Sequence, residues 1–95
     1  MTAYKQPSEQ IPLSLDFSAV LPTGETVQSS STVKIVDPDG ADVTATMLLD
    51  SSTDDSAVYA IITGGTGLLD YKVTFTALTQ NYKFEEDIVL KVREQ

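Results

Sequence analysis

Apolar and polar residues alternate along most of this chain of 95 residues. In a β-strand successive side chains point to opposite faces, so alternation places one face in a core and the other in solvent. The alternation is clearest at residues 11–17 and 71–77. No segment shows the repeat of about 3.6 residues that is typical of an amphipathic helix. The pattern therefore predicts an all-β protein.

The alternating segments predict seven strands. We place them at residues 11–17, 26–27, 32–36, 43–49, 57–63, 71–78 and 84–92. Short strands that recur about every 8–12 residues are typical of a β-sandwich. No helix separates neighbouring strands, so we expect antiparallel pairing. The predicted fold is a single immunoglobulin-like antiparallel β-sandwich of about seven strands, in which the strand at 57–63 is buried on both faces.

Proline, glycine and aspartate mark the turns between these strands. Residues 21–24 read Leu-Pro-Thr-Gly, and residues 64–67 read Gly-Gly-Thr-Gly. Residues 37–40 read Asp-Pro-Asp-Gly, which favours a hairpin turn, because proline fixes φ and glycine accepts a positive φ. Residues 50–56 are polar and low in complexity, so we expect an exposed loop there.

The first ten residues differ from the rest of the chain. Pro7 and Pro12 disfavour a helix, and Tyr4 is the one residue here that is apolar enough to favour burial. We therefore divide the chain into an extended N-terminal arm, residues 1–10, and an Ig-like sandwich domain, residues 11–95. In this interpretation the core begins at Ile11, and removal of residues 1–9 is expected to leave folding unchanged.

Tyr71 lies at the start of the penultimate strand, two residues before Val73. In immunoglobulin domains a tyrosine at this position forms a tyrosine corner, in which its hydroxyl bonds to backbone a few residues upstream. Tyr71 is therefore a candidate for this structural role. The alternative is that Tyr71 is an ordinary strand aromatic residue.

The chain is strongly acidic, with 14 Asp and Glu residues against 6 Lys and Arg and a formal net charge of −8. Binding to nucleic acid or to anionic membranes is disfavoured, because contacts to phosphate need Lys and Arg. Residues 37–70 contain several aspartates and no Lys or Arg. This asymmetry marks either a set of solvated turns or an acidic contact surface.

The chain contains no cysteine and no histidine. Disulfides, thiolate nucleophiles, the commonest zinc ligand and the Ser-His-Asp arrangement are therefore excluded. No segment approaches the ~20 apolar residues that a membrane-spanning helix needs. We expect a non-enzymatic protein without catalytic residues, cofactor or metal.

Two acidic segments are candidates for metal binding or catalysis. Asp37 and Asp39 have the alternate spacing of a calcium loop, but no glutamate follows at the required distance, so a hairpin turn is the favoured interpretation. The run Glu85-Glu86-Asp87 offers paired carboxylates of the kind that glycosidases use. Because adjacent strand residues point to opposite faces, these carboxylates do not share a site.

Two parts of the chain carry a family resemblance. The first reads Leu-Ser-Leu-Asp-Phe-Ser at 13–18 and Leu-Pro-Thr-Gly-Glu-Thr-Val at 21–27. The second reads Thr-Gly-Gly-Thr-Gly at 63–67, Asp-Tyr-Lys-Val-Thr-Phe-Thr-Ala at 70–77 and Asp-Ile-Val-Leu-Lys-Val at 87–92. Together they resemble small Ig-like accessory proteins encoded among the virion-structure genes of tailed bacteriophages. Members of that group often carry a tryptophan near the first or third strand, and this chain has none.

The resemblance implies a structural component of a tailed-phage virion, a decoration protein or a protein of the head–tail region. Its expected partners are other virion proteins (capsid, connector or tail subunits), and several symmetric copies are expected. The protein would be synthesised in the bacterial host cytoplasm and located in the virion. The alternative function is a carbohydrate- or cell-surface-binding module, which the low aromatic content of 7% and the absence of tryptophan disfavour.

The resemblance also gives the N-terminal arm a function. We expect residues 1–10 to dock on a neighbouring virion subunit through Tyr4, Lys5, Pro7 and Glu9. Tyrosine suits such contacts because it combines an apolar ring with a polar hydroxyl. An extended segment can add to the exposed sheet edge of a partner. The alternative is a disordered terminus without a role.

Overall fold

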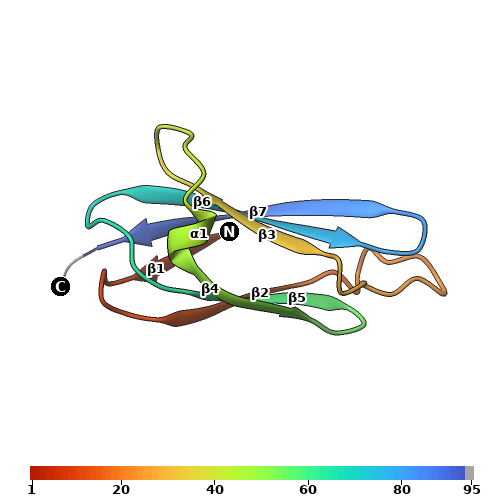
Figure 1. The fold of residues 1–95 in the computed structure, drawn as a ribbon. Coiled ribbons are helices and arrows are strands. Elements are labelled where there is room, and N and C mark those ends of the chain that lie inside the picture. Colours follow the sequence, from red (N-terminus) through yellow and green to blue (C-terminus); the bar gives the residue numbers. More distant parts are fainter. Residues whose placement is uncertain (94–95) are drawn as a thin grey trace.

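A computed structural model describes residues 1–93 of the chain. In this part of the chain two β-sheets pack face to face and form an all-β sandwich (Figure 1). The molecule is elongated, with principal extents of 44 × 22 × 21 Å. The prediction of an all-β sandwich is confirmed. Across residues 1–93, no helix is long and apolar enough to span a membrane.

The larger sheet has four strands in the order β1-β7-β6-β3. Their bounds are β1 Thr2–Lys5, β7 Lys83–Val92, β6 Asp70–Leu78 and β3 Thr32–Val36. The long strands β6 and β7 pair along their whole length, from Asp70 opposite Lys91 to Leu78 opposite Lys83. They are the longest strands of the described chain and fix the long axis of the molecule (Figure 1).

The smaller sheet has three strands in the order β2-β5-β4. Their bounds are β2 Ile11–Asp16, β5 Ala57–Ile62 and β4 Leu48–Thr53. A short helix, α1 Thr44–Met47, joins the two sheets between β3 and β4. Both strand pairs of this sheet are antiparallel.

The core lies between the sheets and consists of the apolar side chains at alternate strand positions. On β6, Tyr71, Val73, Phe75 and Ala77 are buried, and the residues between them are more exposed. The register predicted for β6 is therefore confirmed. On β5 the alternation continues, with Tyr59 and Ile61 facing solvent. This strand is therefore buried on one face only, and the expectation that both faces are buried is wrong.

The predicted strand at 43–49 is wrong over its first half, because residues Thr44–Met47 form α1. Val43 and Met47 lie four residues apart, so both can face the core from a single helical turn. The Asp42 carboxylate accepts a hydrogen bond from the Thr44 backbone N–H over 2.9 Å, which favours a turn at this point. An alternating pattern this short fits both a strand and a helical turn.

The segment 50–56 was expected to be a loop, but β4 extends through Thr53. Its side chains are mostly polar and exposed because β4 is an edge strand that pairs only with β5. Conversely, residues 26–27 form no strand, although Val27 is buried. The turn at residues 37–40 is present, and Val36 pairs with Asp42 across it in one antiparallel bridge before the chain passes into α1 and the other sheet.

The N-terminal segment belongs to the sandwich rather than forming an arm outside it. β1 pairs in parallel with β7, from Thr2 opposite Val89 to Lys5 opposite Val92. The expectation that all pairing is antiparallel is wrong at this pair, because residues 6–82 lie between the two strands and supply the long connection that parallel strands need. Removal of residues 1–9 would remove β1 and the buried Lys5, so we now expect this truncation to destabilise the fold.

Tyr71 is buried at the start of β6. Its hydroxyl accepts a hydrogen bond of 2.9 Å from the backbone N–H of Thr66, five residues upstream. A bond from the hydroxyl to upstream backbone is the contact that characterises a tyrosine corner. It ties the glycine-rich segment 64–67 to the start of the strand.

Candidate protein-binding surfaces

The outer face of the four-stranded sheet carries a mixture of charged and apolar side chains. Tyr4 on β1 lies beside Lys91 on β7, and Lys91 lies beside Asp70 on β6. The Asp70 carboxylate pairs with Arg93 over 2.7 Å and with Lys91 over 3.2 Å. The bond from Arg93, followed by that from Lys91, lowers the pKa of Asp70 below its usual value. Tyr4 remains 64% exposed next to this cluster.

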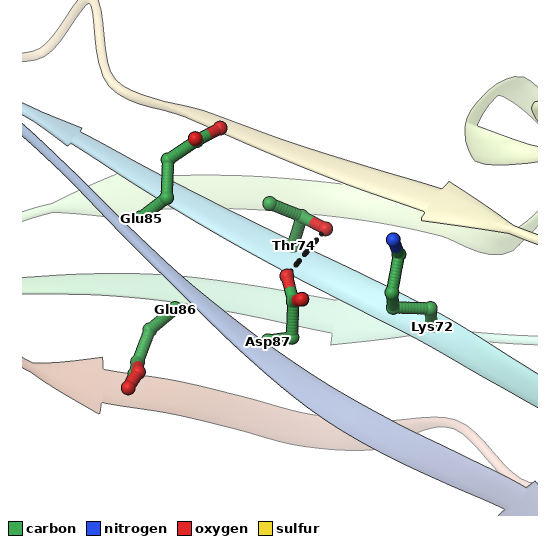
Figure 2. Close-up of a pocket in the computed structure, with 5 residues that line it drawn as sticks. All are labelled: Lys72, Thr74, Glu85, Glu86 and Asp87. Atoms are coloured by element: carbon green, nitrogen blue, oxygen red, sulfur yellow. Dashed lines mark hydrogen bonds between the residues drawn. The ribbon is translucent and has the colours of Figure 1, made fainter.

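A shallow polar hollow of about 480 Å³ lies on the same sheet (Figure 2). Lys72 and Thr74 of β6 face Glu85 and Asp87 of β7 across it, and the Thr74 hydroxyl donates a hydrogen bond of 2.8 Å to Asp87. Glu86 points to the opposite side of the strand from Glu85 (Figure 2). The three adjacent carboxylates of residues 85–87 therefore do not act together, as the alternation of a strand requires.

The described residues offer no cluster suited to metal binding. Within residues 1–93, no group of three or more acidic side chains lies close enough together to hold a metal ion. Histidine and cysteine are absent from the sequence.

The basic residues are confined to one of the two sheets. Lys34, Lys72, Lys83 and Lys91 lie on β3, β6 and β7, Arg93 follows β7, and Lys5 lies on β1. The three-stranded sheet carries no Lys or Arg in any of its strands. The two faces of the sandwich therefore differ in charge, and a partner of the three-stranded sheet meets only acidic and neutral side chains there.

Lys5 is buried, although we expected it to contact a partner. Only 3% of this residue is exposed. Its ammonium donates hydrogen bonds to the backbone carbonyls of Gln6 at 2.6 Å and Pro7 at 3.2 Å, and also to that of Gly64. Burial lowers the pKa of Lys5, and the charge of Glu9 acts in the opposite direction. Lys5 thus closes one end of the sandwich and is not available to a partner.

The other residues expected on the arm are separated from one another. Tyr4 is exposed on the outer sheet face, whereas the carbonyl of Pro7 accepts a bond from Lys5. The Glu9 carboxylate accepts a hydrogen bond of 2.6 Å from the Gln6 backbone N–H. The structure therefore places Tyr4 on an available surface and uses Lys5, Pro7 and Glu9 in local bonds.

A second hollow, which we call the lateral groove, lies between the edges of the two sheets. Its volume is about 340 Å³. Apolar side chains from both sheets and from the loop after β2 line it: Met1, Leu15, Phe17, Ala19, Val20 and Phe84. Asp16, Glu85 and Glu86 also line it. Sequence analysis missed this groove, because its walls come from segments about 65 residues apart that only the fold brings together.

These features define a small β-sandwich domain that offers surfaces for protein contact. A comparison with protein-family models matches residues 5–91 to the family Gp77, described as podophage GP4 fiber-tail adaptor protein gp77. The match spans nearly the whole chain, and the chain belongs to this family. No curated protein matches the chain. The resemblance to small accessory proteins of tailed bacteriophages is thereby confirmed, and the chain is a structural phage component.

Proposed function

We propose that this chain joins a tail fibre to the tail of a podophage through protein–protein contacts. The observation that carries the proposal is the family match over residues 5–91, since the family is described as a fibre–tail adaptor. A tail position is favoured over head decoration for the same reason. The protein acts by binding, and its place is in the assembled virion.

An adaptor needs two distinct binding surfaces, and the charge distribution supports this. The outer face of the four-stranded sheet presents Tyr4 and Val89, exposed by 64% and 39%, among charged residues of both signs. The other sheet carries no basic residue in its strands. Two such surfaces on opposite sides of one domain suit two different partners.

We further propose that the sandwich is immunoglobulin-like. In such domains the first, second, fifth and fourth strands form one sheet, and the third, sixth and seventh strands form the other. The orders β2-β5-β4 and β7-β6-β3 agree with this arrangement, whereas β1 differs from it by pairing with β7. The bond between Tyr71 and Thr66 supports the same assignment.

No observation favours the alternative of a carbohydrate-binding module. Sugar sites use neighbouring exposed aromatic rings. The exposed tyrosines of the described chain are Tyr4 on β1, Tyr59 on β5 and Tyr82 in the turn before β7, so they lie on different elements. They do not form one platform, and the neighbouring rings of Tyr82 and Phe84, with centroids 6.2 Å apart, include only one exposed ring.

The test of the proposed function is complex formation with the fibre and tail proteins of the same phage. We expect the purified chain to bind each protein separately and to bring the two into one complex on size-exclusion chromatography with light scattering. The variant Tyr4→Ser should weaken one of the two contacts. Tyr82→Ser changes a tyrosine of similar exposure in the turn before β7, outside both sheet faces, and serves as the control for Tyr4. Binding to neither protein, or to only one of them, would reject the proposed function.

A further inference from the structure

We propose that the lateral groove receives an extended segment of a partner virion protein, which adds to the free half of β7 as a further strand. The inference rests on the proposed adaptor function and names the chemistry of one contact. The segment alternates apolar residues, which enter the groove, with Lys or Arg residues. Four observations support it: the uncovered half of β7, the direction of its backbone groups, the apolar groove wall and the charge of the rim.

β1 covers only the C-terminal half of β7. Its pairing begins at Thr2 opposite Val89, and the Val89 N–H donates a hydrogen bond of 3.0 Å to the Met1 carbonyl. β7 itself begins at Lys83. Figure 1 shows that β1 starts near the middle of the molecule and runs toward the end where the C-terminus lies. The N-terminal half of β7 thus has β6 on one side and, within residues 1–93, no strand on the other.

The backbone of this uncovered half points its hydrogen-bonding groups toward the free edge. The N–H groups of Val89 and Arg93 donate to the Met1 and Lys5 carbonyls of the β1 side. Backbone groups alternate in direction along a strand, so Glu85 and Asp87 present theirs on the same side. β7 pairs with β6 through its other edge. Within residues 1–93, the backbone groups of Glu85 and Asp87 make no hydrogen bond to a segment on the free edge. An added strand supplies their missing partners.

The groove beside this edge supplies apolar contacts. Leu15 and Phe17 are buried at its wall, whereas Val20 is 54% exposed and Phe84 is partly buried. A strand next to β7 directs every second side chain between the sheets and the others outward. The inward side chains of the added strand therefore meet Leu15, Phe17 and Val20. A segment of about five residues, each advancing ~3.3 Å, is long enough to span the uncovered half of β7.

The rim of the groove selects basic residues in the partner. Asp16, Glu85 and Glu86 line it, and no Lys or Arg does. Glu86 shares the inward-facing register of Phe84 and Ile88, yet it is exposed because no strand covers it. A carboxylate at such a position disfavours non-specific edge-to-edge pairing. It favours a partner strand that places a Lys or Arg side chain opposite it. The charge thus distinguishes the proposed segment from an uncharged strand.

The probes are overlapping 15-residue synthetic peptides that cover the fibre and tail proteins of the same phage. We expect at least one peptide with alternating apolar and basic residues to bind. In heteronuclear NMR spectra its binding should shift the backbone amides of Glu85 and Asp87 and slow their hydrogen exchange. The variants Val20→Asp and Glu86→Lys should each weaken binding by about tenfold or more. Asp39→Lys changes an exposed acidic residue in a distant turn and should leave binding unchanged.

Asp87→Pro is a sharper variant, because it removes an N–H from the free edge and none from the pairing with β6. The melting temperature of Asp87→Pro is measured first. If this variant does not fold, the test relies on Val20→Asp instead. Amide shifts confined to the Tyr4 face, or binding unaffected by the folded variants, would overturn the groove proposal. If the intact fibre and tail proteins still bind these variants normally, only the groove proposal fails. If neither intact protein binds the unmodified chain, both the groove proposal and the adaptor function are rejected.

Discussion

The ammonium of Lys5 donates a hydrogen bond to the backbone carbonyl of Gly64, 59 residues later in the chain. This contact ties the first strand of one sheet to the segment that leads from β5 of the other sheet into β6. The same ammonium also bonds to the carbonyls of Gln6 and Pro7. One buried charge therefore holds the N-terminal segment, the end of the smaller sheet and the larger sheet together.

Replacement of Lys5 by methionine should lower the free energy of unfolding by roughly 1–3 kcal/mol, because three carbonyls lose a charged donor while the side-chain volume is largely kept. Lys34→Met removes an exposed lysine from β3 and should change stability little. Urea denaturation of both variants checks this prediction. Equal midpoints for the two variants would show that Lys5 does not contribute as the geometry indicates.

The core prediction concerns Phe75 and Leu90, which are both fully buried on β6 and β7. Phe75→Ala or Leu90→Ala should cost roughly 3–5 kcal/mol, as large-to-small core changes usually do. Val89→Ala is the control, because Val89 faces solvent from the next position of β7 and is 39% exposed. Chemical denaturation measures all three variants. Near-wild-type midpoints for both core variants would mean that the strand register is shifted by one residue.

Gly65 has a positive φ of +96° and lies against the core. A Cβ atom there would lie 2.9 Å from Val92 Cγ2 and 3.1 Å from Met47 Cε. Gly24 has a similar φ of +85°, but nothing lies within 4 Å of its Cβ position. Both alanine variants bear the cost of a positive φ, so the steric clash should make Gly65→Ala worse by roughly 1–3 kcal/mol. Thermal melts compare the two, and a smaller loss for Gly65→Ala would contradict this packing.

Acid should destabilise the domain. The Tyr59 hydroxyl, followed by the Ser56 backbone N–H, lowers the pKa of Asp54. The Thr79 hydroxyl and then Asn81 lower that of Glu25. A carboxyl with a lower pKa in the folded state contributes stability above its unfolded pKa of about 4, and this contribution is lost as the pH falls through the folded pKa.

Denaturant midpoints measured at a series of pH values check this expectation. They should be nearly constant from neutral pH down to about 5 and fall steadily below about 4. Asp54→Asn removes one of the responsible groups and should make the fall shallower, whereas Asp39→Asn, in an exposed turn, serves as its control. A rise in stability on acidification below pH ~4 would contradict the assigned hydrogen bonds.

The sequence predicted the strands whose two faces differ most in polarity. β6 is central in its sheet, so the alternation of Tyr71, Val73 and Phe75 with polar residues is strong. The edge strand β2 also alternates clearly, so an edge position does not by itself weaken the signal. The signal is weak where a strand is short or polar. β1 and β4 are edge strands with polar sequences, and neither β1 nor residues 50–53 of β4 was predicted. The burial of Lys5 was also not predicted. The residues beside this lysine in the sequence do not indicate the backbone carbonyls that accept hydrogen bonds from its ammonium.

The binding surfaces were harder to predict from the sequence than the fold. Tyr4 was singled out as an amphipathic residue suited to partner contact, and its exposed place on the sheet depends on the parallel pairing of β1 with β7. The lateral groove joins Phe17 and Val20 to Phe84, which no local pattern connects. One local sign was present. Glu86 interrupts the apolar series of Phe84 and Ile88, and a charge at an inward position marks an uncovered part of a strand.

The adaptor function is tested most directly by electron cryomicroscopy of phage particles in which the gene for this chain is disrupted. The account predicts tails that assemble without their fibres, and a return of the fibres when the gene is supplied in trans. Density for the sandwich should lie between fibre and tail in the unmodified particle. Mutant particles with a normal set of fibres, or unmodified virions that lack the chain on mass spectrometry, would contradict it.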